Sequence, residues 1–193
     1  RKFYNLADYI TINISSPNTE NLRSFHNENE LSELLSLIEK EKRILKTSVP
    51  VSVKLSPDIE DKNINIISDL LLKYCVDAVI ISNTSDKNRE NLSNINKLEK
   101  GGLSGKPLEK RSNELINKFY KILKEKIKII GVGGVDSGQS AYQKIISGAS
   151  LVQLYTGMIY QGPSIASKIS EELINILDKE GVKNISDIVG SKN

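Results

Sequence analysis

The sequence is poor in the residues that build disulfides and metal centres. Its 193 residues include one cysteine, one histidine and no tryptophan. A single cysteine excludes an intramolecular disulfide, and with one histidine it also excludes a Cys/His metal cluster, so no metal site is predicted. Cys75 lies in the apolar stretch LLLKYCVDAVII, where we expect a small core residue. His26 lies in the polar stretch SFHNENE, where we expect a solvated loop residue.

The sequence also lacks a strong charge of one sign and a long apolar run. The net charge is +3, from 27 basic and 24 acidic residues. No basic stripe is interleaved with aromatic residues, so no nucleic-acid partner is predicted. No apolar run approaches membrane-spanning length, and the first residues resemble neither a signal peptide nor a transit peptide. Because the chain opens almost directly into an apolar stretch, we expect further sequence upstream of Arg1.

What the sequence does have is a regular alternation of two patterns. Apolar, β-branched stretches that predict strands occupy residues 7–14, 49–56, 77–84, 127–134 and 150–157. Helical periodicity occupies residues 31–38, 66–71, 115–123, 141–146 and 165–176. The strands are near-continuous apolar runs, as expected for parallel strands covered by helices. The order therefore predicts an α/β protein with right-handed crossovers.

Two α/β folds fit this order: an open doubly wound sheet and a (β/α)8 barrel. An open sheet of five strands suits the length, but the first strand–helix turn has no G-x-G-x-x-G pattern. Chemically competent residues follow every strand, which favours a barrel, whose site is built from all the strand ends. We interpret residues 1–193 as the C-terminal part of a single TIM barrel domain, with strands four to eight present.

The first three strand ends carry polar side chains. The first reads NISSPN (13–18), the second is VSVKLSPD (51–58) with Lys54 inside an apolar strand, and the third reads ISNTS (81–85). A lysine facing into a barrel is costly unless it meets an anion or is neutral, although it can also extend to the rim. The SNT triplet alone is also typical of a plain turn or helix cap.

Glycine-rich loops follow the later strands. GGLSG (101–105) precedes the third helix, GVGGV (131–135) ends the fourth strand and LYTG (154–157) ends the fifth. Such glycines let the backbone approach a ligand, and barrels bind phosphate in the loops after strands seven and eight. A phosphate-bearing ligand is therefore predicted. The alternative is that Asp136 and Ser137 cap the next helix and that the glycines only turn the chain.

Six motifs in this order and spacing resemble one family: NISSPNTENLR, VKLSPD, SNT, GGLSG, GVGGVDSG and LYTG look like dihydroorotate dehydrogenase. More narrowly they resemble its class 2, quinone-linked, membrane-associated branch, because Ser16 stands where the other branch has cysteine. The resemblance implies an FMN-containing barrel that oxidises dihydroorotate to orotate in pyrimidine biosynthesis. The sequence departs from the family pattern at Asn21, where family members commonly have glycine. Asn tolerates the left-handed backbone next best.

The resemblance also implies roles for individual residues. Ser16 matches the catalytic base that removes the C5 proton, while hydride leaves C6 for the flavin. The substrate contacts match Asn13, Asn18, Asn83 and Thr84. The FMN contacts match Asn13, Lys54, Ser82, Ser104, Gly105, Gly133, Gly134, Tyr155 and Thr156. A physical argument supports the role of Lys54, because a fixed cation stabilises the negative charge that a flavin gains when it is reduced.

The resemblance places the first strands and the quinone-tunnel helices outside the chain. We therefore expect residues 1–193 alone not to be a competent enzyme. The missing N-terminal region implies attachment to the mitochondrial inner membrane in a eukaryote, or peripherally to the cytoplasmic membrane in a bacterium. Two alternatives stay open: a phosphate-binding barrel lyase with Lys54 as a Schiff base, and an inactive barrel fragment.

Overall fold

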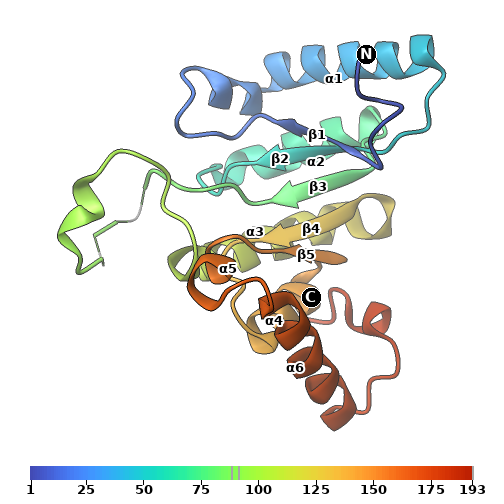
Figure 1. Ribbon diagram of the computed structural model, residues 1–193. Coiled ribbons are helices and arrows are strands. Elements are labelled where there is room, and N and C mark those ends of the chain that lie inside the picture. The colour runs from blue at the N-terminus through green and yellow to red at the C-terminus, as the bar shows by residue number, and fades with distance from the viewer. Residues whose placement is uncertain (88, 91, 193) are drawn as a thin grey trace.

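The computed structural model describes residues 1–87, 89–90 and 92–192 (Figure 1). The strands are β1 Ile10–Asn13, β2 Val51–Leu55, β3 Ala78–Ile81, β4 Lys128–Val132 and β5 Leu151–Gln153. The helices are α1 Glu28–Leu45, α2 Ile64–Lys73, α3 Glu109–Leu123, α4 Gly138–Ser147, α5 Thr156–Gln161 and α6 Ile165–Lys179. Short 3-10 turns lie at Leu22–His26, Asp61–Asn63, Ile95–Leu98, Lys106–Leu108, Lys124–Lys126 and Ile185–Ile188.

The five strands form one parallel sheet in chain order, β1-β2-β3-β4-β5. Each of the five predicted strands contains one of them, so the predicted α/β architecture is confirmed. The register aligns Asn13 with Lys54 and Lys54 with Ile80, which brings the carboxyl ends of the strands to one edge. Because all five strands run the same way, every loop that follows a strand opens at that edge.

Helices cover one face of the sheet, where a continuous apolar core lies. Alternate strand residues such as Val53, Val79 and Ile129 point into it and meet side chains of α2 and α3. Phe119 of α3 is the largest fully buried side chain. Burying apolar surface is worth roughly 25 cal/mol per Å², so this layer supplies the main driving force for the fold.

The opposite face of the sheet is more polar than the near-continuous apolar pattern predicted. Thr11 of β1 and Ser52 of β2 join their hydroxyls at 2.8 Å. Lys54 follows Ser52 two residues along the same strand and so shares its face. The strands therefore alternate between an apolar face under the helices and a face that carries hydroxyl and amine groups.

Three local features differ from expectation or choose between alternatives. The helix α5 was not predicted, because the stretch 150–157 was read wholly as a strand. The prediction for Cys75 was wrong: it is exposed and left-handed (φ 49°), beyond the end of α2, where it cannot reach the core. Ser137 does cap α4, since its hydroxyl accepts from the Ser140 N–H while the Ser140 hydroxyl accepts from the Ser137 N–H.

Candidate active site

A cleft of about 820 Å³ opens at the carboxyl edge of the sheet. Lys54 lines it from β2, and the segments after β3, β4 and β5 complete it. The predicted cofactor and substrate residues found in its lining are Lys54, Ser82, Asn83, Thr84, Ser104, Gly105, Gly133, Gly134, Tyr155 and Thr156. The parallel register explains why residues far apart in the chain meet here, because each lies at or after the carboxyl end of a neighbouring strand.

Lys54 is the isolated cation of this cleft. It is half-buried, and burial lowers the pKa of its amine from the usual value. Within the described residues, no hydrogen bond or ion pair to its Nζ atom is found. A desolvated amine without an acidic neighbour is stabilised by an anionic ligand. The cleft is therefore suited to a molecule that carries or develops negative charge next to β2.

An amide–hydroxyl network joins the first strand end to the third. Asn83 Nδ2 donates to Asn13 Oδ1 at 3.2 Å and to Ser15 Oγ at 3.0 Å. Ser15 is buried, and its hydroxyl donates in turn to Asn13 Oδ1 at 2.9 Å. Asn83 Oδ1 accepts from the Thr84 N–H at 2.8 Å. Both amide oxygens are therefore used internally, which orients the Asn13 Nδ2 group for a ligand.

Ser16 lies next to this network, on the loop after β1. It is half-buried, and its hydroxyl accepts from the Asn18 N–H at 3.3 Å, which closes a tight turn across Pro17. Neither Asn13 nor Ser16 is among the residues that line the main cleft. The network connects Asn13 to that lining, through Asn83, whereas the position of Ser16 as a catalytic residue stays a prediction.

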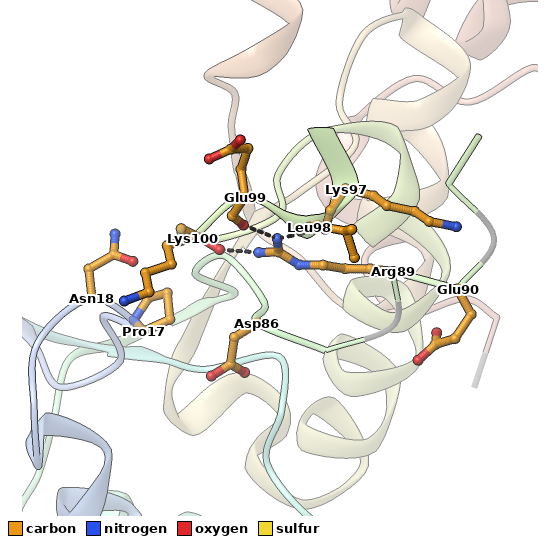
Figure 2. A pocket seen from close by; sticks show the side chains of 10 residues that line it. Pro17, Asn18, Asp86, Arg89, Glu90, Lys97, Leu98, Glu99 and Lys100 are labelled. Atoms are coloured by element: carbon orange, nitrogen blue, oxygen red, sulfur yellow. Dashed lines mark hydrogen bonds between the residues drawn. The ribbon is translucent and has the colours of Figure 1, made fainter. Parts of the chain in front are cut away.

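Asn18 faces a second hollow of about 770 Å³ rather than the main cleft (Figure 2). Pro17 and Asn18 form one wall, and the segment after β3 forms the other. Figure 2 shows Arg89 reaching across this segment, where its guanidinium donates to the carbonyls of Lys97 at 3.2 Å and Glu99 at 2.6 Å. The carbonyl of Gly101 accepts a further bond from Arg89. The two hollows are neighbours. The loop that carries Asn18 borders the amide–hydroxyl network on one side and the segment after β3 on the other.

Gly102 lines the main cleft, directly after Gly101 of the second hollow, and was not singled out from the sequence. A Cβ atom there would lie 1.9 Å from Thr84 Oγ1 and 3.1 Å from Pro17 Cγ. Only glycine therefore lets the segment after β3 pack against both the Ser16 loop and Thr84. The signal was present in the GGLSG motif, but sequence alone does not tell which glycine makes the close approach.

The other glycines bring backbone to the cleft. Gly105 and Gly134 both have φ of +80°, a conformation that favours glycine. A Cβ on Gly105 would lie 2.9 Å from Thr156 Cγ2, and the Thr156 hydroxyl donates to Ser104 Oγ at 2.9 Å. The loop before α3 is thus fastened to the start of α5. Tyr155, by contrast, is exposed.

A charged cluster at the cleft rim was also missed. Lys106 lines the cleft and pairs with Glu109 at 2.6 Å and Asp136 at 3.5 Å. The hydrogen bond that the Lys106 amine donates to the Glu109 carboxylate raises the pKa of that amine. Lys106 directly follows GGLSG and Asp136 follows GVGGV, so their positions after the motifs were the available signal. The cluster places a second cation near the glycine turns.

The loop that carries Ser16 is anchored at its far end by Arg23. Its guanidinium pairs with Asp86 at 2.8 Å and Asp58 at 3.2 Å, and lies 3.4 Å from the Thr84 carbonyl. The bond from Arg23 lowers the pKa of the Asp86 carboxyl. Asp58 also accepts from Ser85 Oγ at 2.5 Å. The loops after β1, β2 and β3 therefore converge on one ion cluster.

The prediction that His26 is solvated was wrong. The ring is buried, its Nδ1 lies 3.0 Å from the Arg23 carbonyl, and its Nε2 accepts from the Ser56 N–H at 3.2 Å. A carbonyl on one side and an N–H on the other fix the neutral tautomer with the proton on Nδ1. Burial lowers the pKa of the imidazole accordingly. Its partner Ser56 directly follows β2 and lies 30 residues away in the chain, which sequence reasoning could not supply.

Two kinds of feature are absent from the described part of the chain. No group of three or more acidic, His or Cys residues there is arranged to hold a metal ion. None of the helices in those residues combines the length and the apolar character that crossing a bilayer requires.

Comparison with known proteins gives a consistent result. The family model described as dihydroorotate dehydrogenase matches residues 1–177. The dihydroorotate dehydrogenase (quinone) of Trichodesmium erythraeum is 42% identical over 203 residues, covering 100% of the chain and 52% of that relative. The mitochondrial dihydroorotate dehydrogenase (quinone) of Mus musculus is 41% identical over 187 residues, covering 96% of the chain and 47% of that relative. The chain thus spans about half the length of these curated relatives.

Solved structures agree. The crystal structure of ligand-free DHODH from Eimeria tenella superposes with a TM-score of 0.93 at 35% identity, covering 97% of the chain and 56% of that structure. The Eimeria tenella DHODH in complex with ferulenol gives a TM-score of 0.92 at 35% identity, covering 96% and 54%. The five-stranded sheet is therefore part of the (β/α)8 barrel that these structures contain, which confirms the barrel predicted from the functional residues at every strand end.

Proposed function

The chain belongs to the dihydroorotate dehydrogenase family, and from this premise we propose that the intact protein oxidises dihydroorotate to orotate in pyrimidine (UMP) biosynthesis. We propose FMN as its cofactor and a quinone as its electron acceptor, which the quinone-type names of the relatives support. The observation that carries the proposal is the cleft where Lys54, which has no partner within the described residues, lies with the glycine turns after β3 and β4.

The residues of the cleft fit a flavin mononucleotide. Gly105 and Gly134 hold left-handed turns in which a Cβ atom would collide with Thr156 or Glu109, so backbone can approach a phosphate there. Lys54 supplies the fixed cation for the negative charge that a reduced flavin gains. When bound, FMN supplies a hydride acceptor. The residues proposed to hold it are Asn13, Lys54, Ser82, Ser104, Gly105, Gly133, Gly134, Tyr155 and Thr156.

Ser16 is proposed to accept the C5 proton of dihydroorotate. The turn across Pro17 fixes its hydroxyl. Asn13, Asn83 and Thr84 are proposed to bind the planar, amide-rich substrate, and Asn18 is proposed to contact it from the neighbouring hollow. The chain's one imidazole, His26, is engaged with the Ser56 N–H and cannot activate Ser16. The proton therefore passes from Ser16 to water or a neighbouring hydroxyl.

Replacing Ser16 tests this role. In the intact protein, Ser16→Ala should lower kcat for dihydroorotate by about a hundredfold or more, the usual contribution of a positioned base, while bound flavin remains. Ser16→Cys should keep part of the activity, since a thiolate can accept the proton. Steady-state kinetics and the flavin absorbance of the purified variants provide the measurement. Full activity of Ser16→Ala would remove the assigned base.

A direct observation tests the cofactor. The intact protein should be yellow, and its flavin absorbance should bleach when dihydroorotate is added without an electron acceptor. A folded but colourless protein would contradict the proposal. The family assignment leaves the Schiff-base lyase without support, and borohydride trapping of a carbonyl substrate on Lys54 would be needed to restore it.

The quinone acceptor implies a location. Quinones dissolve in the bilayer, so we propose attachment to the mitochondrial inner membrane in a eukaryote or to the cytoplasmic membrane in a bacterium. The mitochondrial name of the mouse relative supports the first. We further propose that the five strands are the last five of the barrel and that a region outside residues 1–193 makes the membrane contact. Fractionation of cells that express the intact protein tests this, because it should sediment with membranes.

A further inference from the structure

Lys144 is a fully buried lysine that the proposed reaction does not use. It lies on α4, and its Nζ atom is 3.0 Å from Ser112 Oγ and 3.0 Å from Asn113 Oδ1 on α3. No carboxylate contacts this amine within the described residues. Burial lowers the pKa of the Lys144 amine to about 7, while the charge of Glu109 raises it and that of Lys106 lowers it further.

The space for this lysine is made by Gly131. A Cβ atom on Gly131 would lie 3.0 Å from Lys144 Cδ and 3.1 Å from the Ala149 Cβ. Any larger residue at 131 would therefore crowd the lysine stem. The first glycine of GVGG serves the buried amine behind β4, whereas Gly133 and Gly134 face the cleft.

Ser112 transmits the position of the amine to the end of β4. Its hydroxyl donates to the Val132 carbonyl at 2.6 Å, and that carbonyl also accepts from the Ser82 N–H at 3.1 Å. A Cβ on Gly133 would lie 3.5 Å from Ser112 Cβ, so the serine supports the turn from behind. The Lys144 amine, the Ser112 hydroxyl and the Val132 carbonyl form one continuous series of hydrogen bonds that ends at the cleft lining.

Stability alone does not account for this arrangement. A buried amine without an ionic partner loses hydration that neutral acceptors restore only in part, and an apolar side chain of similar volume is usually at least as stable. The advantage of the buried lysine must therefore lie in the geometry that its hydrogen bonds fix. The chain of hydrogen bonds ends on the Val132 carbonyl, which lies between two segments of the cleft.

We propose that Lys144 is a positioning residue that, through the Ser112 hydroxyl, fixes the Val132 carbonyl and the Gly133–Gly134 turn in the conformation that receives the FMN phosphate. The identity of the ligand rests on the proposed function. The fixing of the turn by Lys144 does not, so the two can be tested separately.

The first test compares two flavins on the apo form of the intact protein. Lys144→Met removes the amine at similar volume, and Ser112→Ala removes the relay with little change in packing. Lys121→Met, at an exposed position of α3, is the matched control. Fluorescence titration should show FMN binding about tenfold or more weaker in Lys144→Met and Ser112→Ala, the loss expected for a charge-assisted hydrogen bond. Riboflavin, which lacks the phosphate, should bind all four proteins alike.

The second measurement is amide hydrogen exchange, which needs no ligand. Residues 132–135 should exchange faster in Lys144→Met and Ser112→Ala than in Lys121→Met, with unchanged exchange in the β2 and β3 core. The double variant should show no further increase, because both changes cut the same chain.

The outcomes separate the proposals. Unchanged exchange at 132–135 in Ser112→Ala, or equal losses of FMN and riboflavin affinity, would overturn the positioning role. If Lys144→Met does not fold, Ser112→Ala still tests whether the Ser112 hydroxyl, through which Lys144 acts, holds the turn. If the unmodified protein binds neither flavin, the proposed function fails, while the exchange measurement still decides whether Lys144 holds the turn.

Discussion

At the scale of single residues, glycines with the same sequence signature have different physical reasons. Gly131 leaves room for a lysine stem, Gly102 lets two loops meet, and Gly134 combines a left-handed backbone with a close approach to Glu109. Gly181 is left-handed too (φ +69°), but no atom lies within 4 Å of the Cβ position. A comparison of the same substitution at Gly134 and at Gly181 therefore distinguishes the cost of a left-handed backbone from the cost of a steric clash.

Gly134→Ala should destabilise the protein far more than Gly181→Ala. At Gly181 the added methyl meets only the left-handed penalty, about 1–2 kcal/mol. At Gly134 it would also lie 2.5 Å from Glu109 Cβ and 2.9 Å from Glu109 Cα, so α3 or the turn must move. Denaturant unfolding of both variants measures the difference. Equal destabilisation would show that the turn can shift without cost.

At the scale of elements, the ion cluster around Arg23 fastens three strand-end loops together. Asp58 comes from the loop after β2, Asp86 from the segment after β3, and Arg23 from the turn that follows the Ser16 loop. The His26 ring adds a second tie, from that same turn to the Ser56 N–H. Such ties hold the proposed base against the amides of the neighbouring loop, where misplacement by about 1 Å can cost a hundredfold in rate.

Arg23→Gln should therefore impair catalysis more than stability. In the intact protein we expect kcat/KM for dihydroorotate to fall by about tenfold to a hundredfold. Arg23→Lys should recover part of this loss, because lysine keeps the positive charge but cannot make the two-pronged hydrogen bonds of a guanidinium. The matched control is Arg43→Gln, which breaks an exposed pair with Glu39 on α1. Steady-state kinetics and thermal unfolding give both readouts. Kinetics equal to those of the control would rule out a role in loop positioning.

At the scale of the whole molecule, the sheet is an open arc. β1 pairs only with β2 and β5 only with β4, so both edge strands have unpaired backbone groups in the described residues. A hollow that reaches β5 is lined by Pro50, Ala78, Ile130 and Leu151 together with charged residues such as Asp77 and Lys128, and Leu151 is 61% exposed. An open edge next to exposed apolar surface is a template for association.

Residues 1–193 alone should therefore self-associate. Sedimentation velocity should show a weight-average mass that rises with concentration. Leu151→Lys should suppress this, because a charge on an edge strand blocks pairing. Ile174→Lys, at a similarly exposed position on α6, should not. A monomer at all concentrations would mean that the open edges are protected.

The sequence by itself determined the strands, their order and the motifs at their ends. These features are local: β-branched runs and glycine loops are read from neighbouring residues, and the parallel order then brings the strand ends to one edge. Five strands and five of the helices were predicted on this basis, and the barrel family followed from six motifs in order. Among the α-helices of the described residues, α5 was not predicted, because six residues directly after a strand carry too little periodicity.

The tertiary structure decided which of these groups meet. Burial of His26 depends on a backbone N–H 30 residues away, and burial of Lys144 depends on a glycine in another element. The structure also placed Asn18 in a second hollow and packed Gly102 closely against Thr84 and Pro17. Contacts of this kind depend on chain folding rather than on neighbouring residues. The sequence therefore named the groups at the strand ends, and packing alone assigned their surroundings.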